Sequence, residues 1–153
     1  MILVLAVRLG RTAKMSKVRI LVVDDIASWR ELVSSVFRSE LSFEIICEAV
    51  DGKQAVVMAE RLQPTIALLD VGLPKLSGID AAREIRKLAP STKIAFLSEQ
   101  RDPDVVKAAL NVASGYVLKS DAATDLVPAI HSVARGERFI SRQLADLRRE
   151  NTF

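Results

Sequence analysis

The stretch that decides the fold is Val18-Arg-Ile-Leu-Val-Val-Asp-Asp25, a short and mostly apolar run that ends in two aspartates. A second run, Ile66-Ala-Leu-Leu-Asp70, also ends in an aspartate. Runs of this kind are typical of parallel strands that are covered on both faces. We therefore expect strands at 18–23 and 66–69, and similar runs predict three more at 44–47, 94–97 and 116–118.

Segments of helical period lie between the expected strands. We place helices at 27–39, 53–62, 78–88, 104–112 and 122–135, and a weaker polar helix at 141–150. Asp51-Gly52 and Asp102-Pro103 are start signals for two of these helices, and Gly136 closes the helix at 122–135. Pro128 falls inside that helix, so a kink or a late helix start is expected there. The alternation predicts a doubly wound α/β domain with a parallel sheet.

Polar side chains stand directly after four of the expected strands, and they are Asp24 with Asp25, Asp70, Ser98 and Lys119. Ligands of open parallel sheets bind at the carboxyl ends of the strands, so these side chains converge if the first and third strands are neighbours. Clustered carboxylates repel each other by about 4 kcal/mol per pair at roughly 4 Å and an effective dielectric of roughly 20, so a cation must offset them. Oxygen ligands suit Mg²⁺, whereas a lysine and a hydroxyl suit phosphoryl oxygens. The set therefore predicts a phosphoryl group carried on a carboxylate.

The composition indicates an ordered globular chain and excludes several classes of function. Half of the 153 residues are hydrophobic and 27% are charged. The net charge of +3 is accounted for by three basic residues in positions 1–14, so the rest of the chain has no surplus for nucleic-acid binding. The single cysteine, Cys47, is expected to be a small buried residue. The single histidine, His131, is expected to be a solvated helix residue without metal partners.

Four motifs occur together in a fixed order along the chain. They are Val22-Val23-Asp24-Asp25, Leu68-Leu69-Asp70-Val71-Gly72-Leu73-Pro74 with Gly78, Phe96-Leu97-Ser98 and Gly115-Tyr116-Val117-Leu118-Lys119. In this order and spacing they resemble the signature of bacterial two-component response-regulator receiver domains, over residues from about 18 to 136. The resemblance implies a flavodoxin-like (βα)5 fold with a five-stranded parallel sheet in the order 2-1-3-4-5.

The resemblance also implies roles for the residues at the strand ends. Asp70 would be the phosphoacceptor, and Lys119 would pair with the phosphoryl group. Mg²⁺ would be held by Asp25, Asp70 and the carbonyl oxygen of Gly72, with Asp24 reaching the ion through water. The protein would catalyse only its own phosphotransfer and dephosphorylation, and in that sense it would not be an enzyme.

A switch and its partners follow from the same resemblance. Ser98 and Tyr116 would form a switch pair that responds to the phosphoryl group and remodels the surface of the helix at 104–112, the strand at 116–118 and the helix at 122–135. A sensor histidine kinase would be the phosphodonor, and the remodelled surface could support a homodimer. We expect a cytoplasmic protein with no membrane contact and no direct nucleic-acid binding by this chain.

The expected domain organisation has three parts. Residues 1–15 are interpreted as a disordered extension or a start-site artefact, 16–137 as the receiver, and 138–153 as a tail or the start of a linker. The region from 115 to 141 is similar to receivers that precede a LuxR-type helix-turn-helix domain, so either the receiver stands alone or an output domain is missing. A DNA-binding factor is disfavoured because no basic recognition helix is present.

Three departures from the family pattern keep a second function open. Glu99 follows the hydroxyl position, where the family has a small residue, and Ser120 follows the lysine, where the family often has proline. Gly72, beside Asp70, leaves the site more open to water. The alternative is a degenerate receiver that binds partners without being phosphorylated. A phosphatase of the haloacid dehalogenase type fits poorly, because its two acids stand two residues apart rather than side by side.

Overall fold

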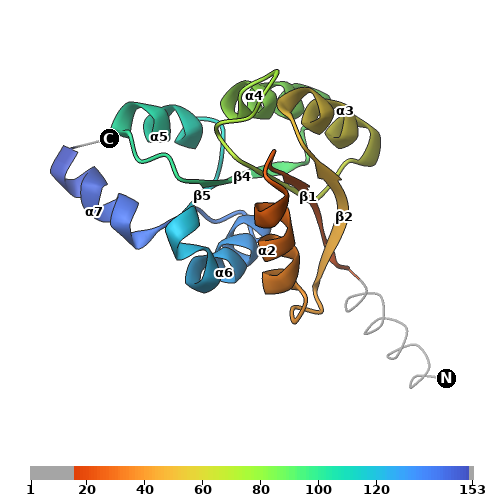
Figure 1. The fold of residues 1–153 in the computed structure, drawn as a ribbon, viewed down its shortest axis with the longest axis horizontal. Coiled ribbons are helices and arrows are strands. Elements are labelled where there is room, and N and C mark those ends of the chain that lie inside the picture. The colour runs from red at the N-terminus through yellow and green to blue at the C-terminus, as the bar shows by residue number, and fades with distance from the viewer. Residues whose placement is uncertain (1–15, 152–153) are drawn as a thin grey trace.

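A computed structural model gives the architecture, and it describes residues 16–151 (Figure 1). Helix labels follow Figure 1 and begin at α2. In chain order the elements are β1 Val18–Val23, α2 Ala27–Phe37, β2 Phe43–Ala49, α3 Gly52–Leu62, β3 Ile66–Leu69, α4 Gly78–Leu88, β4 Lys93–Ser98, α5 Pro103–Leu110, β5 Gly115–Leu118, the 3₁₀ turn η1 Lys119–Asp121, α6 Ala122–Ala134, β6 Phe139–Ile140 and α7 Arg142–Asn151. The predicted disorder of residues 1–15 lies outside the described residues.

The sheet is parallel and follows the order β2-β1-β3-β4-β5-β6. The α/β class and the predicted order of the first five strands are confirmed, but the prediction of five strands is wrong, because the described chain forms six. The additional strand, β6, comes from residues that were predicted to be a tail or the start of a linker. The Phe139 amide donates to the Ser114 carbonyl at 3.0 Å, and the Ser141 amide donates to the Tyr116 carbonyl at 3.0 Å. A strand of two residues is too short to leave a periodic signal.

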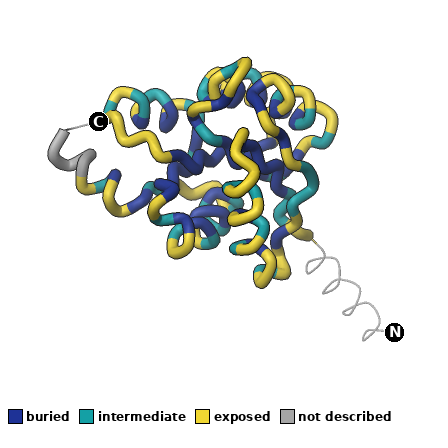
Figure 2. Tube along the Cα trace, viewed as in Figure 1, coloured by how far each residue is buried: buried dark blue, intermediate teal, exposed yellow. Residues whose placement is uncertain are grey.

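Helices cover both faces of the sheet and bury a core on each (Figures 1 and 2). Alternating residues of β1 show the division: Leu21 and Val23 face the core beneath α3, α4 and α5, whereas Ile20 and Val22 face the core beneath α2 and α6. All four are at most 2% exposed. This double burial explains why the central strands read as continuous apolar runs.

The helix starts follow the sequence signals. Asp51 caps α3 by accepting a hydrogen bond from the Gln54 amide at 2.8 Å, and Asp102 caps α5 with Pro103 as its first residue. The prediction that α6 starts late is wrong, because this helix runs without interruption from Ala122 to Ala134 and contains Pro128. Side chains therefore cap α3 and α5, whereas α2 and α6 begin without a side-chain cap.

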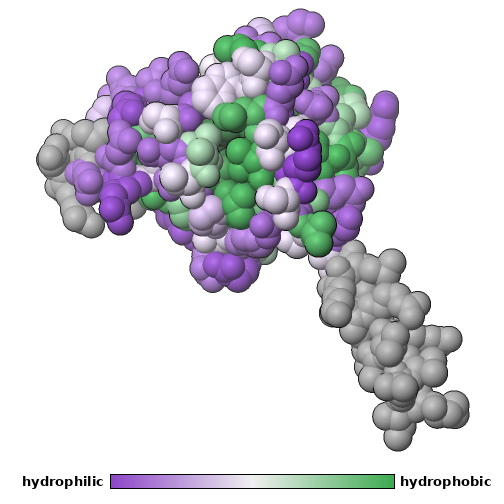
Figure 3. Space-filling view, turned by 60° about the horizontal axis from the view of Figure 1, so that its bottom comes forward, coloured by the Kyte–Doolittle hydropathy of each residue, from purple (hydrophilic) through white to green (hydrophobic). Residues whose placement is uncertain are grey.

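The side of the molecule formed by α2 and α6 faces the viewer in Figure 3, where apolar surface at the centre is bordered by polar surface. Large apolar side chains that remain exposed include Ile26, just before α2, and Leu32 within it. Among residues 16–151, no helix is both long enough and apolar enough to cross a membrane.

Candidate functional site

Three aspartates meet where β1 and β3 end. Each of Asp24, Asp25 and Asp70 offers a carboxylate oxygen, and these atoms lie within 4.8 Å of one another. The strands β1 and β3 are neighbours with Val23 paired to Leu69, so the residues that follow them are brought to the same edge. Asp24 is buried, Asp70 is partly buried and Asp25 is exposed. The structure therefore brings the three predicted acids together and leaves the cluster open to solvent.

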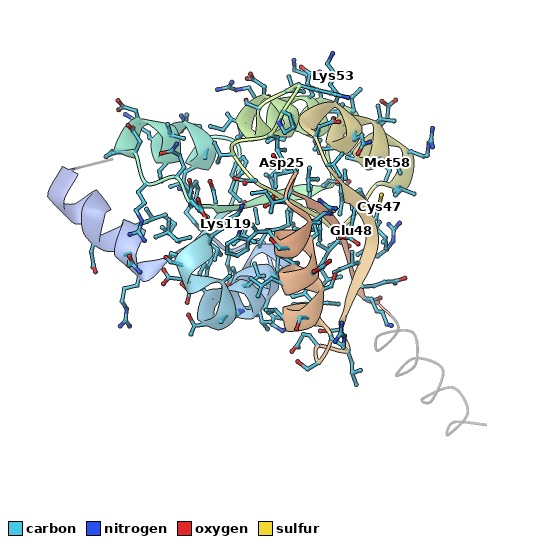
Figure 4. All side chains as sticks on the ribbon, viewed as in Figure 1. Asp25, Cys47, Glu48, Lys53, Met58 and Lys119 are labelled. Atoms are coloured by element: carbon cyan, nitrogen blue, oxygen red, sulfur yellow. The ribbon has the colours of Figure 1, made fainter. Side chains whose placement is uncertain are left out.

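Lys119, labelled in Figure 4, directly follows β5, and its ammonium lies between two of these acids. Its Nζ lies 2.8 Å from Asp24 Oδ2 and 2.8 Å from Asp70 Oδ2, and the side chain is only 3% exposed. Burial acts to lower the pKa of Lys119, but the hydrogen bonds and charges of Asp24 and Asp70 outweigh it, so the pKa is raised. Lys119 therefore stays charged and neutralises part of the acidic cluster.

Trp29 also belongs to the site, although it was not among the residues predicted to form it. Lys119 Nζ lies over the Trp29 ring, 4.7 Å from its centroid, which is within the range of a cation–π interaction. The available signal was position: Trp29 is on the first turn of α2, the helix that begins shortly after Asp25. The ring therefore contacts the ammonium from the side of α2.

The loop from β3 to α4 holds Asp70 in place. Gly78 opens α4, and its amide donates to the Val71 carbonyl at 2.8 Å. A Cβ atom at Gly78 would collide with the backbone carbonyl of Asp70, so only glycine allows this close approach. The Gly72 amide faces the Asp70 carboxylate, with N to Oδ1 at 3.3 Å, and a Cβ there would meet nothing within 4 Å. The two glycines on this loop therefore differ sharply in the space around them.

Ser98 and Tyr116, the predicted switch pair, lie on the adjacent strands β4 and β5. Ser98 is buried at the end of β4 and pairs in register with Leu118, the residue before Lys119. Tyr116 is fully buried, and its hydroxyl donates to the Gln100 carbonyl at 2.7 Å. Burial raises the pKa of Tyr116 to about 12, against a lowering by a hydrogen bond with Ser98 and with a further rise from the Asp70 charge.

Two expectations about single residues need correction. Cys47 is half-buried rather than fully buried, because β2 is an edge strand; it packs against the core beneath α3, where Met58 lies nearby (Figure 4). His131 is not simply solvated: its Nε2 lies 3.0 Å from Glu40 Oε1, and its ring centroid is 4.7 Å from that of Phe43. Neither residue belongs to the acidic site.

The three departures are also placed by the structure. Glu99 is exposed directly after Ser98, and Gly72 is exposed on the loop after Asp70. Ser120 is exposed within η1, and every described peptide bond is trans, the Lys119–Ser120 bond included.

The fold and the site together define a doubly wound α/β domain whose carboxyl edge carries three aspartates and a buried lysine. Residues 20–131 match the family of response regulator receiver domains. The chain belongs to this family.

Relatives and solved structures agree with this assignment. The chain is 34% identical over 126 residues to the transcriptional regulatory protein DegU of Brevibacillus brevis, covering 82% of this chain and 53% of DegU. It is 32% identical over 126 residues to the nitrate/nitrite response regulator protein NarL of Escherichia coli (strain K12), covering 82% of this chain and 58% of NarL. The chain thus spans little more than half the length of these curated relatives.

A LuxR-family two-component response regulator from Aurantimonas sp. SI85-9A1 has a similar crystal structure, with a TM-score of 0.84 and 30% identity, covering 90% of this chain and 99% of that one. The signal receiver domain of the putative response regulator NarL from Mycobacterium tuberculosis has a TM-score of 0.76 and 32% identity, covering 80% of this chain and 99% of that one. The fold is therefore that of receiver domains in two-component response regulators.

Proposed function

We propose that this chain is a phosphorylation-dependent signalling switch in which Asp70 accepts a phosphoryl group from a sensor histidine kinase. The observation that carries the proposal is the shared lysine: Lys119 Nζ lies 2.8 Å from both Asp70 and Asp24, at an edge that solvent can reach. Membership in the receiver family supports the same function.

The donor set fits Mg²⁺. Three carboxylates and one ammonium leave two negative charges, and the three acids offer oxygen atoms within 4.8 Å of one another. Asp24, Asp25 and Asp70 would hold the ion, and the Gly72 carbonyl is proposed as a further oxygen ligand. When bound, the cation would neutralise the carboxylates and stabilise negative charge on the phosphoryl oxygens.

The side chains of the protein divide the remaining work. An Asp70 carboxylate oxygen forms the bond to phosphorus while the bond from phosphorus to the donor's imidazole nitrogen breaks, and that nitrogen keeps the electron pair. Lys119, protonated and held in place, neutralises a phosphoryl oxygen. The Ser98 hydroxyl donates a hydrogen bond to another phosphoryl oxygen.

The output of the switch is proposed to be a change of surface. Ser98 and Tyr116 respond to the phosphoryl group, and the surface of α5, β5 and α6 changes, which could support a homodimer. Relatives named as transcriptional and nitrate/nitrite response regulators suggest that an output partner reads this surface. We propose a cytoplasmic location, where a kinase would reach the domain.

The test is incubation with Mg²⁺ and acetyl phosphate, followed by intact mass measurement. The wild type should gain the mass of one phosphoryl group and lose it on hydrolysis, whereas Asp70→Asn should gain nothing. Asp104→Asn, at an exposed aspartate on α5, is the matched control and should behave as the wild type. An unchanged mass in the wild type would favour the degenerate receiver instead.

A further inference from the structure

We propose that Arg101 is a latch that ties the state of the phosphorylation site to helix α7. The inference rests on the proposed function and adds a route by which the site could be read at the C-terminal side of the domain.

The loop between β4 and α5 is fastened directly to the switch pair. The Gln100 amide donates to Ser98 Oγ at 3.2 Å, and the Gln100 carbonyl accepts from the Tyr116 hydroxyl at 2.7 Å. Both backbone groups of Gln100 therefore depend on the two side chains that are proposed to respond to the phosphoryl group. A turn of the Ser98 hydroxyl toward that group removes the acceptor of the Gln100 amide.

Arg101, the next residue, extends from this loop to two other segments. Its Nη1 donates to Gln143 Oε1 at 2.6 Å, and its Nη2 donates to Ser120 Oγ at 3.1 Å. Gln143 in turn donates to Asp121 Oδ1 at 3.1 Å. The network thus joins the loop after Ser98, the η1 turn that begins with Lys119, and the first turn of α7. Ser120, a departure from the family pattern, supplies one of the acceptors.

Helix α7 is built onto the receiver rather than merely following it. Ser141, fully buried, accepts a hydrogen bond from the Leu118 amide at 3.0 Å, one residue before Lys119. Leu144 is also fully buried and belongs to the core beneath α5. Gln143 lies between these two anchors, so its contact with Arg101 acts on a helix that is already docked.

The energetics suit a switch. The hydrogen bonds of Arg101 are exposed to solvent, and such bonds are individually weak, so a modest shift of the loop is enough to break them. Weakly held segments are the ones that change state when a neighbouring site is modified. When the hydrogen bonds of Arg101 are formed, α7 is held against the loop. When Ser98 turns toward a phosphoryl group, Arg101 moves away and the first turn of α7 becomes less stable.

Hydrogen–deuterium exchange of the peptide covering residues 141–146 tests the proposal. The full chain is compared without additions and with Mg²⁺ and beryllofluoride. In the wild type, beryllofluoride should raise exchange in this peptide by about threefold to tenfold, since the hydrogen bond from Arg101 to Gln143 is lost. In Arg101→Ala and in Gln143→Ala, exchange should already be raised and should change little further. Lys107→Ala, at an exposed cation of α5, should match the wild type.

Three outcomes would overturn this role of Arg101, and the first two leave the proposed function standing. If peptides around Asp70 become protected by beryllofluoride while residues 141–146 stay unchanged, the coupling is wrong and the phosphorylation switch stands. If Arg101→Ala leaves the exchange of residues 141–146 identical to that of the wild type in both states, Arg101 is not the latch. If no peptide responds and acetyl phosphate adds no mass to Asp70, the proposed function fails, and the coupling fails with it.

Discussion

The carboxyl edge of the sheet and the last segment of the described chain are held in place in different ways. At the carboxyl edge, Asp24, Asp70 and Lys119 stand directly after strands, and the ladder of β1, β3, β4 and β5 brings them together. On the side of α5 and α7, Ser141 and Leu144 reach the core from a segment without a clear pattern. Strand ends are thus positioned by repetitive hydrogen bonding, whereas the last segment joins the sheet over only Phe139 and Ile140 and is otherwise anchored by individual side chains.

The largest expected effect is the loss of an anchor from the irregular side. Leu144 is fully buried, so Leu144→Ala should lower the free energy of unfolding by about 3 kcal/mol through lost burial and a new cavity. Leu41→Ala removes the same atoms from a side chain that is 86% exposed and should cost less than about 0.5 kcal/mol. Urea unfolding, followed by the fluorescence of the single tryptophan, measures both. Equal effects of the two substitutions would mean that α7 contributes nothing to the stability of the receiver.

A second pair of substitutions tests the strand-end side. Gly78→Ala places a Cβ against the Asp70 carbonyl and should cost about 2 kcal/mol by forcing the backbone apart. Gly72→Ala meets nothing within 4 Å and should change the free energy of unfolding by less than about 0.5 kcal/mol. The sign of the change in the free energy of unfolding for Gly78→Ala is informative, because alanine within a helix is otherwise more favourable than glycine. A stabilised Gly78→Ala variant would contradict the close approach.

The difference between the regular strand ends and the irregular last segment also explains which features could be predicted from the sequence. The α/β class, the five longer strands and the convergence of Asp24, Asp25, Asp70 and Lys119 follow from apolar runs with polar ends. The sixth strand could not be predicted, because Phe139 and Ile140 are too few to show a period. Likewise, Trp29 over Lys119 and Glu40 beside His131 are contacts between distant segments that no local pattern encodes.

Tyr116 joins the two regions, since its ring is in the core and its hydroxyl holds the loop that carries Arg101. Burial raises the pKa of this side chain to about 12 in the folded state, above its ordinary value of about 10. The neutral form is therefore favoured by folding, and the stabilisation is complete below pH of about 10 and is lost as the pH rises toward about 12. We expect a loss of about 2 kcal/mol over that window, absent in Tyr116→Phe.

Absorbance of tyrosinate measures this titration directly, because the chain has one tyrosine. Ionisation of the folded protein near pH of about 10 would mean that the hydroxyl is not held in the core as described.

The smallest expected effect concerns the contact between Trp29 and Lys119. A cation over an aromatic face stabilises by about 0.5 to 1 kcal/mol where the ring is partly exposed, as that of Trp29 is. Trp29→Phe retains an aromatic ring and Trp29→Leu does not, so Trp29→Leu should lower the free energy of unfolding further. Part of the difference between the two variants should depend on Lys119. Both substitutions are made in the wild-type background and in the Lys119→Met background. This double-mutant cycle isolates the interaction between ring and ammonium, because the loss of apolar packing is the same in both backgrounds and cancels. Unfolding followed by circular dichroism should show a coupling of about 0.5 kcal/mol. If the difference between Phe and Leu is the same with and without the ammonium, Trp29 only fills space at the edge of the core, and the aromatic ring has no part in holding Lys119 between Asp24 and Asp70.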